Sequence, residues 1–131
     1  IRTIAITPSG KIYVGGDFTF FDGVAVGRVA RLNADGSLDK TFDPGGGFEA
    51  PVRALEIEPG GKLLVGGEFT SFQLTNAVGR LTRLNVDGTL DATYMSAVTG
   101  TKGADDFVSA LALQPDGLLV VGGAFTSFNG L

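Results

Sequence analysis

The chain of 131 residues has no cysteine, no histidine and no tryptophan. Without cysteine it cannot form disulfide bonds, use a thiol nucleophile or build the cysteine-rich sites that hold structural zinc. Without histidine it lacks the general base of a Ser-His-Asp triad. Paired carboxylates are therefore the one catalytic arrangement that the composition leaves open, as in glycoside hydrolysis.

Positive charge and long apolar runs are also scarce. The chain has 10 Lys and Arg against 14 Asp and Glu, which gives a net charge of -4. Binding to nucleic acid by counterion release needs many basic contacts, so we expect no nucleic-acid partner. No segment approaches the run of about 20 apolar residues that spans a bilayer as a helix, so we expect no membrane insertion by this segment.

Glycine, by contrast, is abundant. The 21 glycines among 131 residues are about 16 per cent, roughly twice the usual share. A chain that is 44% hydrophobic and 18% charged is too apolar for a disordered linker. The glycines are therefore expected in turns and close strand contacts of an all-β protein.

The sequence repeats itself. The pattern Pro-x-Gly-Lys-x-x-Val-Gly-Gly-x-Phe starts at Pro8, returns 51 residues later at Pro59, and returns in altered form 56 residues further on at Pro115. A second pattern, Arg-Leu-Asn-x-Asp-Gly-x-Leu-Asp, starts at Arg31 and again at Arg83. Such a period is typical of propellers and other repeat arrays. We divide the chain into copy 1 (residues 1–51), copy 2 (52–107) and the first hairpin of an incomplete copy 3 (108–131).

Each complete copy contains the signals of four short strands. In copy 2, residues 52–58 and 63–65 flank a Pro-Gly-Gly turn and predict a hairpin. Residues 80–84 predict a third strand, and 89–94 a fourth after an Asn-x-Asp-Gly turn. Four antiparallel strands per unit of about 50 residues predict β-propeller blades. The chain supplies about two and a half blades, which we interpret as part of a larger propeller with an exposed edge at its unfinished third blade.

The repeats also predict specific contacts. A three-residue turn in copy 1 pairs Leu32 with Leu38, which places Arg31 opposite Asp39 on the other face of the hairpin. The same count applies in copy 2. The predicted structural ion pairs are Arg31 with Asp39 and Arg83 with Asp91.

The pattern Phe-Thr-x-Phe occurs in all three copies, as Phe18 and Phe21, Phe69 and Phe72, and Phe125 and Phe128. We expect these rings to fill the space between adjacent blades. A stacking platform for a ligand is the alternative. Arg28 and Arg80, which precede the third strands, could bind carbonyl or carboxylate groups of a neighbouring blade or stay at the surface.

These motifs resemble the delta-60 repeats, a family of bacterial tandem repeats assigned to a β-propeller-like domain of uncharacterised function. The resemblance covers nearly the whole chain except residues 96–106. The chain departs from the family pattern at Tyr94, where copy 1 has Phe42. The resemblance implies a parent protein at the bacterial surface or secreted, and it brings no catalytic residue.

Two motifs that could hold a metal or a phosphate do not fit. With Gly36 at the sixth place of a calcium loop, Arg31 and Phe42 fall at ligand positions, where neither can bind calcium. The glycines at 45–47 are not followed by the Lys-Ser/Thr of a phosphate-binding loop. We therefore expect no metal site and no cofactor.

Asp17 and Glu68 occupy equivalent places after the paired glycines and are candidates for a carboxylate pair. Copy 3 has Ala124 there, so the blade itself does not require the acid. A solvated strand end explains both residues equally well.

Loop length varies on only one rim of the predicted propeller. The added residues fall between the second and third strands and between successive copies, and in an up-and-down blade both connections emerge on the same side. Insertions gathered on one face of a repeat protein often mark its binding face, although unconstrained surface loops also vary. The candidate partner-binding residues are Gln73, Thr75, Asn76, Thr101, Lys102, Asp105 and Asp106.

The sequence thus predicts a non-catalytic β-propeller segment of a larger bacterial surface or secreted protein, a scaffold for adhesion or for binding a protein or glycan. A propeller enzyme that cleaves polysaccharide with carboxylates is the first alternative. The second is a structural component of an extracellular fibre or surface assembly. Its open edge would pair with further blades of the same chain or with other copies.

Overall fold

The computed structural model describes residues 1–73, 76–94 and 106–125, and all regular secondary structure in these ranges is β. The strands are β1 (Thr3–Ile6), β2 (Ile12–Gly15), β3 (Phe20–Phe21), β4 (Val24–Ala25), β5 (Val29–Leu32), β6 (Val52–Ile57), β7 (Leu63–Gly67), β8 (Ser71–Phe72), β9 (Asn76–Ala77), β10 (Leu81–Leu84), β11 (Val108–Leu113) and β12 (Leu119–Gly123).

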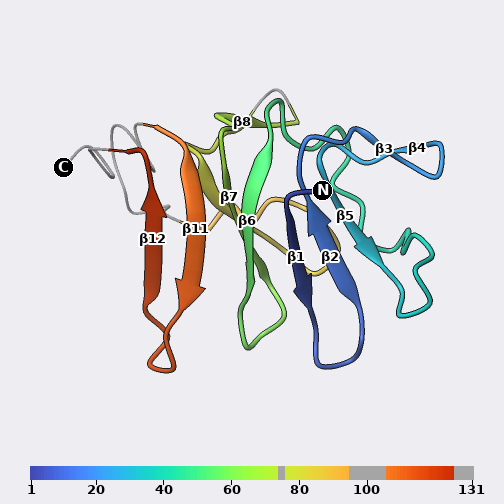
Figure 1. Ribbon diagram of the computed structural model, residues 1–131, viewed down its shortest axis with the longest axis horizontal. Helices are drawn as coiled ribbons and strands as arrows, with labels where there is room; N and C mark the ends of the chain where they lie inside the picture. Colours follow the sequence, from blue (N-terminus) through green and yellow to red (C-terminus); the bar gives the residue numbers. More distant parts are fainter. Residues whose placement is uncertain (74–75, 95–105, 126–131) are drawn as a thin grey trace.

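The main strands form three antiparallel units, one from each copy. Copy 1 gives a sheet of order β1-β2-β5, copy 2 a sheet of order β6-β7-β10, and copy 3 the hairpin β11-β12. Figure 1 shows the first strand of each unit, β1, β6 and β11, next to one another in the middle of the molecule. The prediction of an all-β, blade-like architecture is confirmed.

The predicted fourth strand of each blade is reduced to a single bridge. Leu32 pairs with Leu38, and Leu84 with Leu90, but no ladder follows either bridge. The next residue in copy 1 is the cause, because the Asp39 carboxylate accepts hydrogen bonds from the Thr41 backbone N–H and hydroxyl. This local turn takes the chain away from the sheet, so the regular sheets have three strands.

One small hairpin lies between the second and third strands of each of copies 1 and 2, where the sequence predicts only a loop. In copy 1, β3 and β4 pair Phe21 with Val24. The intervening Asp22 and Gly23 have φ of 47° and 77°, as the residues of a type I′ turn require. The Asp-Gly dipeptide between apolar residues was the signal for this hairpin.

The core lies mainly between the sheets of copies 1 and 2. The ring of Phe48 is 4.1 Å from that of Phe69 and 5.0 Å from that of Phe72, centroid to centroid, and all three are buried. The predicted role of the copy 2 phenylalanines between blades is confirmed. Phe18 and Phe21 pack on a smaller cluster in copy 1, and Phe128 lies outside the described residues.

Candidate functional site

A buried ion pair connects β5 to the turn that follows it in copy 1. Arg31 Nε donates to Asp39 Oδ2 at 2.8 Å, and Lys11 Nζ lies 3.0 Å from the same oxygen. Burial acts to raise the pKa of Asp39, but hydrogen bonds from Thr41, Lys11 and Arg31 outweigh it and hold that pKa well below its usual range. The predicted Arg31–Asp39 pair is therefore present, and it carries a carboxylate that stays ionised at neutral pH.

Arg31 also reaches the neighbouring blade. Its Nη1 donates to the Tyr13 hydroxyl at 3.1 Å and to the Val86 carbonyl at 2.8 Å, and its Nη2 donates to the Thr41 hydroxyl at 3.0 Å. Val86 belongs to the turn after β10 in copy 2. Four of the five N–H groups of Arg31 therefore donate within the described protein, and the bond to Val86 links copy 1 to copy 2.

Copy 2 repeats the arrangement with one change. Arg83 Nε donates to Asp91 Oδ2 at 2.8 Å, and Lys62 Nζ donates to the same atom at 2.8 Å. Hydrogen bonds from Lys62, Thr93 and Arg83 hold the pKa of Asp91 well below its usual range. The Nη1 of Arg83 turns to Glu58 at 3.2 Å, because copy 2 has a glutamate where copy 1 has Thr7. The predicted Arg83–Asp91 pair is present as well.

The candidate catalytic carboxylates, Asp17 and Glu68, are both bonded to arginines. Arg2 Nη2 lies 3.0 Å from Asp17 Oδ2, and its Nη1 lies 3.7 Å from Glu68 Oε2. Arg53 Nε donates to the same Glu68 oxygen at 2.9 Å. Arg2 therefore bridges the acids of two neighbouring blades.

This rim pairing was not foreseen from the sequence, although the repeats contain a signal for it. Arg2 and Asp17 in copy 1 correspond to Arg53 and Glu68 in copy 2, where the pair is kept. The corresponding residues of copy 3 are Ser109 and Ala124, so the arginine and the acid are replaced together. Joint replacement is what a structural pair requires, and it does not call for a catalytic role.

Arg28 lies at the same rim as Arg2 and Asp17, because Thr3 and Val29 both pair with Gly15. Its backbone has φ of 73°, and its Nη1 donates to the Phe48 carbonyl at 2.8 Å. Phe48 lies in copy 1, in the connection that leads to β6 of copy 2, so Arg28 binds a carbonyl of its own copy, and neither predicted alternative describes this contact. Arg80 has nearly the same φ, 70°.

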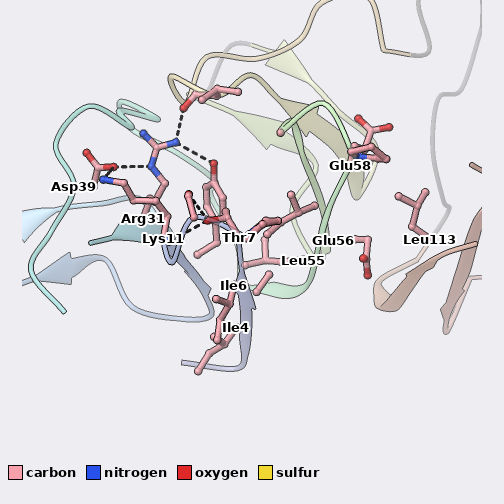
Figure 2. Close-up of a pocket in the computed structure, with 18 of the residues that line it drawn as sticks. Ile4, Ile6, Thr7, Lys11, Arg31, Asp39, Leu55, Glu56, Glu58 and Leu113 are labelled. Carbon is pink, nitrogen blue, oxygen red and sulfur yellow. Dashed lines mark hydrogen bonds and ion pairs between the residues drawn. The ribbon is translucent and has the colours of Figure 1, made fainter. Parts of the chain in front are cut away.

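A groove of about 910 Å³ runs along the rim of the first-to-second-strand turns, lined by residues of copies 1 and 2 and by Leu113 of copy 3. Figure 2 shows Lys11, Arg31 and Asp39 on one wall and Glu56, Glu58 and Leu113 on the other. The Pro8-Ser9 and Pro59 turn residues also line it, as do the exposed side chains of Ile4 and Ile6. The groove thus combines apolar strand surface with polar groups at its mouth, as small-ligand and peptide sites commonly do.

The carboxylate of Glu56 differs from the other acids of this groove. Among the described residues it has no hydrogen bond and no ion pair, although its side chain is half-buried. Copies 1 and 3 have Ala5 and Ala112 at the same place in the strand. Glu56 is therefore a group that the repeat does not need and that a ligand could use.

The predicted partner-binding residues that the structure describes are not part of this groove. Gln73 donates through Nε2 to the Pro44 carbonyl at 2.9 Å, so its amide holds the connection between blades. Asp106 is exposed, and its carboxylate accepts the N–H of Phe107. Asn76 starts β9. The other predicted residues, Thr75, Thr101, Lys102 and Asp105, lie outside the described residues.

The predicted division of the loops between two rims agrees with the structure. In Figure 1 the three turns between first and second strands lie at the lower edge, and β3, β4 and β8 lie at the upper edge. At that upper edge, the N–H of Phe48 donates to the Gly27 carbonyl, and the N–H of Gln73 to the Gly47 carbonyl. The connection between copies therefore shares a rim with the second-to-third-strand connections, opposite the groove.

Within residues 1–73, 76–94 and 106–125, no three acidic side chains come together in a way that could hold a metal ion. The same part of the chain has no helix with the length and apolar character to cross a membrane.

Comparison with family models gives one match, which covers residues 7–42, 58–94 and 114–131. These three ranges follow the three copies and together make up more than half of the chain. A comparison with curated proteins gives no match. The chain belongs to the family described as a domain of unknown function (DUF5122) beta-propeller.

Proposed function

We propose that the chain is a non-catalytic binding segment of a bacterial surface or secreted protein, built from repeats of the delta-60 type, and that it holds its ligand in the groove along the rim of the first-to-second-strand turns. The ligand is an extended stretch of protein or, as the alternative, a glycan. The observation that carries this proposal is the groove itself, which has apolar walls and one carboxylate, that of Glu56, without a partner among the described residues.

The chemistry of the acids argues against hydrolysis. A glycoside hydrolase needs a carboxyl group with a raised pKa as its general acid, facing a second carboxylate across the bond that breaks. Asp39 and Asp91 have lowered pKa values and are buried. Asp17 and Glu68 are bonded to Arg2 and Arg53. The side chains that could act as a pair are thus already engaged in holding the fold.

The lining of the groove favours a protein ligand over a sugar. Ile4, Ile6 and Leu113 offer aliphatic surface, against which apolar side chains of a peptide pack well. The one aromatic side chain of the lining is Tyr13, which is buried and so presents no open ring face to a sugar. Glu56 would attract a lysine, an arginine or an amide of the ligand.

A blocking variant tests the proposal. Ser9 lies at the mouth of the groove and is exposed, so Ser9→Trp fills the groove without disturbing the core. The matched control is Asp116→Trp, at the same turn position of copy 3 and outside the groove. Binding of both variants and the parent chain is measured on arrays of purified extracellular-matrix proteins and bacterial surface polysaccharides.

We expect the parent chain and Asp116→Trp to bind the same array member and Ser9→Trp to lose at least about tenfold in affinity, or about 1.4 kcal/mol. Equal binding by all three would refute the groove as the site. Release of reducing sugar from any polysaccharide, abolished by Asp17→Asn with Glu68→Gln, would instead support the enzyme.

A further inference from the structure

The third strand of copy 1, β5, has an open outer edge. At this edge the Asp39 N–H donates to the Arg31 carbonyl, and the chain then turns away from the sheet. Further along the same edge, the Val29 N–H donates to the Val26 carbonyl. Successive residues of a strand direct their backbone groups to opposite sides, so the Arg31 N–H and the Val29 carbonyl also point outward. Neither group has a partner on that side among the described residues.

A small apolar pocket of about 210 Å³ lies at this open edge. Val29 and Ala30 both line it, although their side chains point to opposite faces of the sheet because they are neighbours in one strand. One pocket includes both residues only where the two faces meet, which is the edge of the strand. The rest of the lining comes from Val24, Ala25 and Val26 on one side and from Leu38, Lys40, Phe42, Asp43 and Pro44 on the other. The pocket therefore occupies the place that the predicted fourth strand leaves empty.

This edge stays accessible whatever number of blades the parent protein has. Figure 1 shows β1, β6 and β11 side by side, and β5 on the far side of β2 from them. In a propeller each blade packs its faces against its neighbours, so its outermost edge points away from the other blades. Every residue that lines the pocket belongs to copy 1.

The character of the pocket is particular to copy 1. Copy 2 has Thr82 in place of Ala30 and Ala92 in place of Lys40. Ala30 is buried at the pocket floor. Lys40 is exposed and has no ion pair or hydrogen bond among the described residues. The repeat thus requires neither the apolar floor nor the lysine beside it.

We propose that the edge of β5 binds an extended segment of another protein, which adds to the copy 1 blade as its fourth strand. The segment's backbone donates to the Val29 carbonyl and accepts from the Arg31 N–H. Both faces of the edge are apolar, so the segment is a short run of apolar residues, as in strands that are covered on both faces. An acidic residue next to that run pairs with Lys40.

This binding is separate from that of the groove ligand, because no residue lines both the groove and this pocket. The available edge from Val29 to Arg31 is about 10 Å long. It offers two backbone hydrogen bonds, so we expect a dissociation constant of about 1 mM for a short peptide.

The test uses the capped peptide acetyl-Glu-Val-Val-Val-Glu-amide, added to the 131-residue chain at up to about 5 mM. The same peptide with N-methylated valines is its control, because it cannot donate its backbone hydrogen bonds. Hydrogen exchange of single backbone amides is followed by NMR. In the free chain we expect the Arg31 amide to exchange at least about tenfold faster than those of Ala30 and Leu32, which point to β2.

At 5 mM peptide, exchange of the Arg31 amide should slow by about sixfold if the dissociation constant is about 1 mM. The N-methylated peptide should leave it unchanged. Ala25→Trp covers the mouth of the pocket and should weaken binding at least about tenfold. The matched control is Ala34→Trp, at an exposed alanine outside the pocket, which should bind like the parent chain.

A charge swap tests the part played by Lys40. Lys40→Glu should bind the original peptide more weakly than the parent chain does, and should prefer acetyl-Lys-Val-Val-Val-Lys-amide. Equal preference of the two proteins for the two peptides would refute the contact between Lys40 and an acidic residue.

Four results would overturn the proposal of strand addition. The first is an Arg31 amide that is as protected as that of Ala30 in the free chain, since the donor would then already be paired. The second is exchange at Arg31 that no concentration of peptide changes. The third is equal binding by the N-methylated peptide or by Ala25→Trp. The fourth is protection of Arg31 that rises with protein concentration alone, which would assign the edge to a second copy of the chain.

Discussion

Replacing the buried acid of copy 1, as in Asp39→Asn, should destabilise the protein strongly. The substitution keeps the shape of the side chain but removes the charge that faces Arg31, whose side chain is buried. Breaking a buried pair costs about 3 to 5 kcal/mol. The lower end applies here, because Arg31 keeps its bonds to Tyr13, Thr41 and Val86 and Lys11 is exposed enough to turn to water.

A loss of about 3 kcal/mol corresponds to a fall of roughly 11 °C in the unfolding temperature of a chain this long, since the unfolding entropy is about 2.1 cal/mol/K per residue. Thermal and urea unfolding followed by circular dichroism measure both quantities. Asp35→Asn is the control, because Asp35 lies in the same turn, is exposed and bonds only Ser37. Equal stability of the two variants would refute the structural role of the Arg31–Asp39 pair.

The remaining expectations also concern stability. Folding lowers the pKa of Asp39, so the stability that its carboxylate provides is complete above about pH 4 and is lost as the pH falls further. Between about pH 5 and pH 2 the unfolding temperature of Asp39→Asn should therefore fall by less than that of the parent chain. Gly66→Val should lower the free energy of unfolding by about 1 to 3 kcal/mol, because the added side chain overpacks against copy 3. Gly122→Val should lower it by almost nothing, and urea unfolding of monomeric protein measures both. Phe48→Ala should cost about 3 to 5 kcal/mol, whereas Phe20→Ala, at an exposed ring, should cost under about 1 kcal/mol; chevron or equilibrium unfolding would expose an error in either.

The repeat made the blade architecture and the ion pairs predictable. Two copies of one motif fix the turn length, and side-chain alternation then sets Arg31 opposite Asp39 without knowledge of the rest of the fold. The burial of Phe69 and Phe72 between blades follows from the same reasoning, because a repeated aromatic pair in a stacked array has a neighbour to pack against.

Contacts that depend on how blades stack were harder to predict. The bridge from Arg2 to Glu68 joins residues 66 positions apart in sequence, and only the relative placement of the two sheets brings them together. The fourth strand was overestimated because its residues alternate properly, while the side-chain hydrogen bonds of Asp39 and Asp91 favour a turn. The groove has no signal in the sequence, because it lies beside turns of constant length, whereas the loops that vary in length lie at the opposite rim.

The central claim is that the acids of the blades hold the structure and the groove holds the ligand. The most direct test uses the ligand found on the binding arrays and compares its binding to the Asp17→Asn, Glu68→Gln double variant with its binding to Ser9→Trp. The bound ligand is then recovered to determine whether it has been cut. We expect the double variant to bind within about twofold of the parent chain, Ser9→Trp to lose binding, and the ligand to be recovered intact. A ligand that the parent chain cleaves and the double variant leaves whole would contradict the claim.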